Sequence, residues 1–216
     1  MAFESKYVTT CPCWLVATDE AGRGPLAGPV VAGAVALRVE SQEHLKQVIT
    51  ELRAAGVNDS KKLTATRREA IAVLAWKNLN TTWTQLDAGE IDRINILTAS
   101  LQAMKLAAEE AVSSDKKLPV VWLIDGNRKP IDANAVWKVH PIVKGDAHSA
   151  LIGLASVMAK VQRDGIMQKF HEQYPQYGFD QHAGYPTEKH RQAIITHGPT
   201  PIHRQTFRGV REYLPR

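Results

Sequence analysis

The chain has 216 residues, of which 44% are hydrophobic and 23% charged, a balance that is typical of a globular protein and excludes a disordered one. No apolar run approaches the ~20 residues of a membrane span, and the N-terminus carries no long apolar segment of a signal peptide. The net charge of +5, with a pI near 9.2, favours a polyanionic partner.

The first half of the chain predicts a sheet with helices beside it. Two apolar runs on either side of a Gly-Arg-Gly turn predict neighbouring antiparallel strands. Leu45, Val48, Ile49 and Leu52 then recur at helical spacing and predict one buried helix face. In chain order we expect strands at 14–18 and 29–37, helices at 41–55 and from the Thr64 cap to about 78, a strand at 81–86 and a long helix at 88–112.

The second half alternates strands and helices. A short β-branched run that ends at Asp125 is typical of a buried strand with a ligand at its carboxyl end. We expect strands at 119–124 and 136–143, a helix from Gly145 to about 174 and another at 187–197. Strands first, then strands alternating with helices, predict an α/β fold with a mixed central sheet flanked by helices.

Two adjacent carboxylates, Asp19 and Glu20, follow the first predicted strand. Carboxylates at a strand end supply the hard oxygen ligands that Mg²⁺ and Mn²⁺ prefer. The glycines of the following Gly22-Arg23-Gly24 allow close backbone approach to a ligand, and the arginine between them can meet a phosphate. An ordinary β-turn explains the same residue types, but metal ligands beside a phosphate-binding segment indicate metal-dependent chemistry on a nucleic acid.

Four acidic residues lie at predicted element boundaries, beside glycine or an apolar run: Asp19, Glu20, Asp125 and Asp146. Carboxylates that converge from different elements can hold two divalent ions, which activate a water and stabilise the leaving oxygen in two-metal nucleases. Each residue also has a structural interpretation, as a surface or turn residue or, for Asp146, as a helix cap. Asp164 is a rival for the fourth position, but within a helix it is better explained by a local ion pair.

The C-terminal segment is basic, and only Glu212 opposes its positive charges after residue 188. Such a segment is typical of a surface that binds a nucleic-acid backbone, and we expect Arg204 to contact phosphate. Lys61 and Lys62 either contact phosphate too or lie in a solvated loop. The basic residues of the segment are Lys189, Arg191, Arg204, Arg208, Arg211 and Arg216.

The two cysteines, Cys11 and Cys13, form a C-x-C pair, and no second pair is present to complete a zinc site. We therefore interpret them as reduced thiols of a cytoplasmic protein.

Several segments spread over nearly the whole chain carry the pattern of one known family. The longest is the twelve-residue string from Asp19 to Val30. The others are residues 58–63 (NDSKKL), 91–97 (IDRINIL), 123–127 (LIDGN), 143–147 (VKGDA), 155–164 (ASVMAKVQRD), 177–179 (YGF), 182–187 (HAGYPT) and 203–204 (HR). Together they resemble ribonuclease HII, the bacterial type 2 ribonuclease H family, and their spread makes this resemblance far more specific than a single short motif.

The resemblance implies a ribonuclease-H-like fold over residues 1–216, with residues from about 176 to 216 as a C-terminal helical, substrate-binding segment. It makes the four carboxylates the catalytic, metal-binding set for two Mg²⁺ or Mn²⁺ ions. The Gly22-Arg23-Gly24 segment matches the one that recognises the 2′-OH and the backbone at an RNA–DNA junction. Tyr185 matches the tyrosine that stacks on the sugar of the following deoxynucleotide, although a core tyrosine would be the ordinary interpretation.

The resemblance also implies the reaction. The expected enzyme is a monomer that cleaves RNA–DNA hybrids, and duplex DNA on the 5′ side of an embedded ribonucleotide, leaving 3′-OH and 5′-phosphate ends. One alternative is another ribonuclease-H-like nuclease, such as a type 3 ribonuclease H or a junction resolvase. Only 18 residues precede Asp19, however, which leaves no room for the N-terminal substrate-binding domain usual in type 3 enzymes. The other alternative, a non-catalytic hybrid-binding module, is disfavoured by the intact carboxylates.

Overall fold

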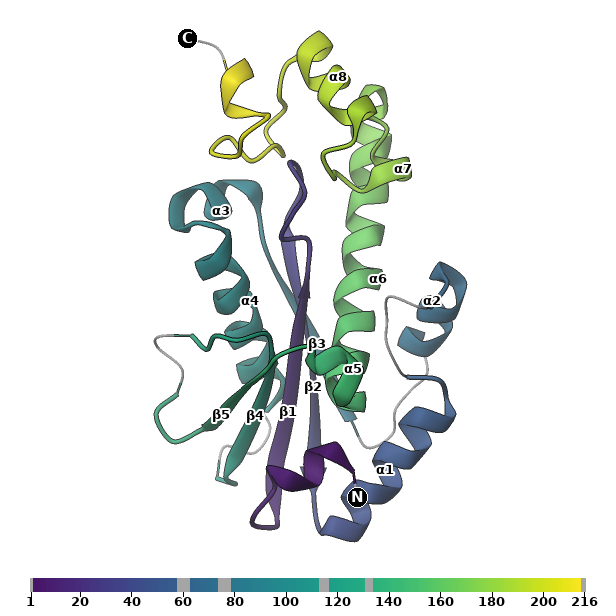
Figure 1. Cartoon of the computed structure of the whole chain (residues 1–216), viewed down its shortest axis with the longest axis vertical. Helices are drawn as coiled ribbons and strands as arrows, with labels where there is room; N and C mark the ends of the chain where they lie inside the picture. The colour runs from purple at the N-terminus through teal and green to yellow at the C-terminus, as the bar shows by residue number, and fades with distance from the viewer. Residues whose placement is uncertain (1, 58–62, 74–78, 113–116, 131–133, 215–216) are drawn as a thin grey trace.

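The computed structural model describes residues 2–57, 63–73, 79–112, 117–130 and 134–214. Its centre is a five-stranded sheet with the order β3-β2-β1-β4-β5 (Figure 1). β1 pairs antiparallel with β2 and parallel with β4, so the sheet is mixed, as predicted. The strands are β1 (Cys13–Ala21), β2 (Val30–Val39), β3 (Leu79–Leu86), β4 (Val120–Asp125) and β5 (Lys138–Ile142).

Helices cover both faces of this sheet, with α4 on one side and α6 on the other (Figure 1). Alternate residues of β1 point to opposite faces. Leu15 and Ala17 pack with α1 and α6, while Trp14 and Val16 pack with α4. The α-helices are α1 (Gln42–Ala54), α2 (Ala65–Val73), α3 (Ala88–Ile94), α4 (Ile96–Ala111), α5 (Gly145–His148), α6 (Ala150–Gln173), α7 (Phe179–His182) and α8 (Glu188–His197).

The predicted buried face of α1 and the predicted Thr64 cap of α2 are confirmed. Ser41 accepts a hydrogen bond from the His44 backbone and begins α1, whose four predicted apolar residues are all buried. Thr64 caps α2 through the Arg67 backbone N–H, although the predicted end of this helix near residue 78 lies outside the described residues. Thr187 caps α8 in the same way.

Two of the long predicted helices are wrong, because each is divided by a residue that caps a new helix. Asn95 adopts φ 67° and accepts a hydrogen bond from the Thr98 N–H, which separates α3 from α4. Ser149 is extended and accepts from the Ile152 N–H, which separates α5 from α6. Short polar side chains that bond to the backbone compete with helix continuation. The second break sets α5, which carries Asp146, apart from the 24-residue α6.

The C-terminal segment packs against the loop that follows β1. Its apolar residues form a small core with Leu26 and Ala27, which follow the Gly-Arg-Gly segment. Two of the backbone contacts that join them run from the Leu26 N–H to the Gly184 carbonyl and from the Arg204 N–H to the Leu26 carbonyl. Short 3₁₀-helices lie at Phe3–Lys6, Pro175–Tyr177 and Arg211–Tyr213. None of the helices within the described ranges is both long and apolar enough to cross a membrane.

Candidate active site

The parallel pairing of β1 and β4 brings Asp19 and Asp125 side by side. Thr18 is the register partner of Ile124, so the next position along both strands pairs the two aspartates. Neighbouring strands are ~4.8 Å apart, and residues at the same register point to the same face. Thr18 faces α4, where its hydroxyl accepts a hydrogen bond from Trp122 Nε1 at 3.0 Å. Alternation therefore turns both carboxylates toward α6.

Asp19 is the most strongly perturbed carboxyl of this group. Its side chain is buried, and the burial, the charge of Glu20 and the charge of Asp125 raise its pKa well above the usual value. Burial also raises the pKa of Glu20, against the lowering effect of Arg23 at 3.3 Å. Carboxylates that repel each other at one buried edge supply the hard, anionic oxygens that a divalent ion would neutralise. Among the described residues, no group of three or more His, Cys, Asp and Glu side chains is already gathered closely enough to hold a metal ion.

Asp146 lies at the start of α5, directly after a residue that contacts Asp125. The backbone N–H of Gly145 donates to Asp125 Oδ1 at 2.6 Å, so the residue before Asp146 contacts the third carboxylate. Lys144 occupies the N-cap position, which means that the interpretation of Asp146 as a helix cap is wrong. Asp164 accepts a hydrogen bond from Lys160 Nζ at 2.6 Å within α6, as its predicted local ion pair requires.

Close contact between β2 and α6 places a further polar group at the site. Gly33 is the register partner of Asp19, and a Cβ there would lie 2.3 Å from the Ala155 carbonyl oxygen. The backbone of α6 therefore lies directly against the sheet at this point. The next residue, Ser156, hydrogen-bonds the Asp19 carboxylate and opposes the rise in its pKa. Ser156 was not predicted from the sequence, because a small residue within a helix gives no local sign of a role at a site.

A cavity of about 300 Å³ opens beside Glu20. Gly22, Arg23, Gly24 and Tyr185 all line it, and the Tyr185 ring lies next to Gly24. The Tyr185 side chain is 43% exposed, so it is not a core residue. Three more cationic side chains line the cavity, which gives it the charge that a phosphate backbone requires: Arg68, Lys160 and Arg163. Arg68 and Arg163 were not predicted from the sequence.

Two buried arginines hold the carbonyl groups of the loop that follows β1. Arg163 donates to the carbonyls of Ala27, Pro29 and Ala183, which ties this loop to the turn before Tyr185. Because a planar guanidinium carries five donors in a fixed geometry, one such side chain can bind several carbonyls at once.

Arg204 is the second buried arginine that holds this loop. The predicted contact of Arg204 with phosphate is therefore wrong. Its side chain is fully buried and donates to the carbonyls of Gly22, Arg23 and Gly28 at 2.6–3.0 Å. Burial and the charge of Arg163 lower its pKa to about 9, which still leaves it charged at neutral pH. A basic residue in a basic tail suggests an exposed side chain, whereas Arg204 supports the loop from behind.

Arg204→Ala is expected to lower the free energy of unfolding by about 3 kcal/mol, because it leaves buried carbonyls without donors. The slope of binding affinity against salt concentration should stay parental, since no phosphate contact is lost. Arg208, exposed in the same segment, is the control: Arg208→Ala should leave stability within about 0.5 kcal/mol of the parent and reduce the salt slope by about 1. Chemical denaturation and salt titration measure both, and the opposite pattern would restore the phosphate contact to Arg204.

Histidines gather beneath the turn that carries Tyr185. His190 and His203 are fully buried, and their Nε2 atoms lie 3.1 Å apart. His182 stacks on His190 at 4.7 Å between ring centroids. Burial lowers the pKa of both His190 and His203 to about 4, so the folded protein keeps both rings neutral.

This burial predicts a loss of stability in acid. Between pH ~6.5, where an unfolded histidine titrates, and pH ~4, the unfolded chain binds more protons than the folded protein, so the free energy of unfolding falls as the pH falls. The expected loss is roughly 3 kcal/mol per histidine. His203→Gln should weaken this pH dependence and the exposed His197→Gln should not; urea unfolding at pH 7 and 4.5 measures the difference. Equal slopes for parent and His203→Gln would contradict the prediction.

Lys61 and Lys62, predicted to contact substrate, lie outside the described residues.

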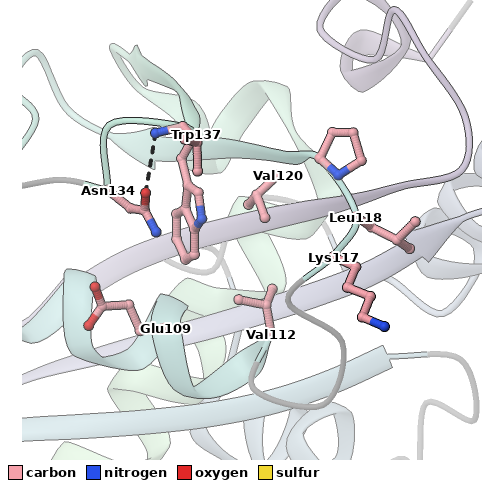
Figure 2. A pocket seen from close by; sticks show the side chains of 9 residues that line it. Glu109, Val112, Lys117, Leu118, Val120, Asn134 and Trp137 are labelled. Carbon is pink, nitrogen blue, oxygen red and sulfur yellow. Dashed lines mark hydrogen bonds between the residues drawn. The ribbon is translucent and has the colours of Figure 1, made fainter.

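A second cavity of about 630 Å³ contains none of the predicted site residues. Trp137, Val112 and Val120 line it, with Glu109 at its edge (Figure 2). It lies at the beginning of β4, whereas Asp125 lies at the end of this strand, about 16 Å away at ~3.3 Å per residue. It is therefore separate from the carboxylates.

Comparison with known proteins identifies the family and the fold. The family model for ribonuclease HII matches residues 16–210. The chain is 44% identical over 195 residues to ribonuclease HII of Zymomonas mobilis, covering 90% of this chain and 84% of the relative. Ribonuclease H2 from Pyrococcus horikoshii OT3 superposes with a TM-score of 0.70 at 25% identity, over 93% of this chain and 96% of that one. Bst-RNase HIII in complex with Mn²⁺, 17% identical over 94% of this chain and 69% of that one, shares the fold with a TM-score of 0.69.

The matches and the architecture define the class first: a ribonuclease with a ribonuclease-H-like α/β fold. The chain belongs to the ribonuclease HII family, whose members are endonucleases that degrade the RNA of RNA–DNA hybrids. The predicted family and fold class are thereby confirmed.

Proposed function

We propose that this protein hydrolyses the phosphodiester on the 5′ side of a ribonucleotide, in an RNA–DNA hybrid or embedded in duplex DNA, and leaves 3′-OH and 5′-phosphate ends. The observation that carries the proposal is the pairing of Asp19 and Asp125 on neighbouring parallel strands, next to a basic cavity. The cavity lies where a substrate backbone can reach the carboxylates. The Gly22-Arg23-Gly24 segment and Tyr185 both line it.

The carboxylates fit a divalent metal by their chemistry. Asp19, Glu20, Asp125 and Asp146 would hold two Mg²⁺ or Mn²⁺ ions, and the mutual repulsion that raises the pKa of Asp19 is what such ions would relieve. Bst-RNase HIII, which has the same fold, was solved with Mn²⁺. Bound divalent ions activate a water and stabilise charge on the leaving oxygen.

The side chains of this chain do the remaining work in the proposal. Ser156 and the Glu20 backbone N–H hydrogen-bond Asp19 and hold its carboxylate in one orientation. The Gly145 N–H does the same for Asp125. Arg23 and Lys160, both at the cavity, would bind substrate phosphates. A protein nucleophile is not required for this reaction.

Cleavage of a duplex with one embedded ribonucleotide tests the proposal. We expect incision on the 5′ side of the ribonucleotide in the presence of Mg²⁺ or Mn²⁺, and none of the matched all-DNA duplex. End-labelling should identify 3′-OH and 5′-phosphate products. Incision of the all-DNA control, or cleavage on the 3′ side, would contradict the proposed reaction.

Three further expectations stay predictions: a monomeric state, a cytoplasmic location and the substrate-binding role of residues from about 176 to 216.

Tyr185 is expected to set the preference for a junction. Tyr185→Ala should lower activity and reduce the ratio of the cleavage rate at one embedded ribonucleotide to the rate on a long hybrid. The reason is that a ring stacked on the next sugar fits a deoxyribose better than a sugar with a 2′-OH. Tyr185→Phe should keep most of the ratio, because it keeps the ring. A parental ratio in Tyr185→Ala would show that the junction is recognised elsewhere.

A further inference from the structure

His203, His190 and the Tyr185 carbonyl form one continuous chain of hydrogen bonds. His203 Nδ1 lies 2.9 Å from the Thr200 backbone nitrogen, and the two Nε2 atoms are 3.1 Å apart. His190 Nδ1 lies 3.0 Å from the Tyr185 carbonyl oxygen. The chain therefore begins at a backbone donor and ends at a backbone acceptor.

These ends determine where each proton lies. The Thr200 N–H can only donate, so His203 Nδ1 accepts and His203 carries its proton on Nε2. That proton is donated to His190 Nε2, which leaves the His190 proton on Nδ1. The Tyr185 carbonyl can only accept, which agrees with this assignment. One arrangement of protons satisfies every contact, and the low pKa of both rings preserves it at neutral pH.

This chain of hydrogen bonds ends at Tyr185, the residue of the 182–187 turn that lines the cavity. The Tyr185 N–H donates to the His182 carbonyl at 2.8 Å, so the backbone of Tyr185 is bound on both sides. The His182 ring accepts from the Gly184 N–H at 3.2 Å. The Gly184 carbonyl in turn accepts from the Leu26 N–H, which links the turn to the loop that carries Gly24. A Cβ at Gly24 would lie 3.5 Å from the Tyr185 ring.

We propose that His190 and His203 are positioning residues that act through the Tyr185 carbonyl, and that this hydrogen-bond chain sets the enzyme's preference for an RNA-to-DNA junction. The inference rests on the proposed function of Tyr185. Phe179 packs edge-on against His190, so an apolar side chain could fill the same space. A packing role alone would not require a proton at one particular nitrogen.

Substitution by asparagine or glutamine distinguishes a hydrogen-bonding role of each histidine from a packing role. The amide nitrogen of asparagine reaches the position of a histidine Nδ1, and that of glutamine reaches the position of Nε2. At residue 190, Asn can still donate to the Tyr185 carbonyl, and Gln cannot. At residue 203, Gln can still donate to His190, and Asn cannot. His190→Asn and His203→Gln should therefore keep the junction preference within twofold of the parent. His190→Gln and His203→Asn should reduce it about fivefold, the effect of one lost hydrogen bond.

The readout is the ratio of cleavage rates on a duplex with one embedded ribonucleotide and on a long hybrid. This ratio does not depend on the fraction of folded enzyme, so variants that are only partly folded can still be compared. A preference that is kept with Asn but not Gln at residue 190, and with Gln but not Asn at residue 203, supports the inference. Equal ratios in all four variants overturn it, as does a loss caused by the same amide at both positions. A parental enzyme without any preference overturns the junction-reading function itself, and a preference lost in Tyr185→Ala but kept in all four variants overturns the histidine chain alone.

Discussion

Asp125→Asn is expected to reduce cleavage at least about 1,000-fold, because a lost anionic metal ligand removes several kcal/mol of stabilisation from the reaction. The fold should persist. Asn keeps an oxygen at nearly the same position, so the Gly145 N–H retains its acceptor. The charge of Asp125 also raises the pKa of Asp19, and its removal relieves a repulsion between buried groups. The variant should therefore be at least as stable as the parent.

Single-turnover cleavage and thermal unfolding measure the two halves of this expectation. Asp164→Asn is the matched control, because it makes the same chemical change in α6 at a residue that pairs with Lys160. It should retain far more activity than Asp125→Asn or Asp146→Asn. Parental rates for Asp125→Asn under saturating Mg²⁺ would remove Asp125 from the catalytic set. Reduced stability would show that the charge of Asp125 is compensated in the folded protein.

Gly22→Ala is expected to lower both stability and activity. Gly22 adopts φ +97°, and a Cβ there would lie 2.1 Å from Arg163 Nε and 2.8 Å from the Pro29 carbonyl oxygen. An alanine must therefore displace one of the arginines that hold the loop. We expect a loss of about 2 kcal/mol in the free energy of unfolding. Cleavage should fall about 100-fold, because the loop beside the carboxylates is misplaced.

Gly24→Ala is the control for this substitution, two residues along the same loop. A Cβ at Gly24 meets only the Tyr185 ring, at 3.5 Å, so stability should stay within about 0.5 kcal/mol of the parent. Any loss of activity should appear in substrate affinity, where the added methyl group obstructs close approach of a nucleotide. Denaturation curves and the separation of kcat from KM distinguish the two variants. Equal stability losses would mean that the conformation at Gly22 does not limit the loop.

The carboxylate edge could be predicted from sequence because its signals are local. Asp19 and Asp125 each end an apolar run, and parallel strands bring such ends together. Asp146 also lies at an element boundary, but its immediate neighbours favour a helix cap, and the resemblance to a family favoured the metal-binding interpretation instead.

The supports of the site could not be predicted, because they depend on contacts between distant parts of the chain. Arg204 belongs to a basic tail, and nothing in its neighbours shows that it enters the core. His190 and His203 are thirteen residues apart and without a metal-binding spacing, so their contact exists only once α8 has packed. The breaks at Asn95 and Ser149 were missed although their cause is local: each side chain accepts a backbone hydrogen bond three residues ahead, but asparagine and serine also occur within helices, so the residue type alone does not indicate a break.

The contact between Arg204 and Gly22 spans 182 residues, nearly the length of the chain. During synthesis the N-terminal strands leave the ribosome long before the arginine that binds their loop. Domains generally fold as units, and the carbonyl groups of the Gly-Arg-Gly loop have no guanidinium donor from Arg204 until that residue has been synthesised. A nascent or C-terminally truncated chain would thus contain Asp19, Glu20, Asp125 and Asp146 but not an ordered loop beside them. The order of this loop therefore depends on the C-terminal segment and not on the sheet alone.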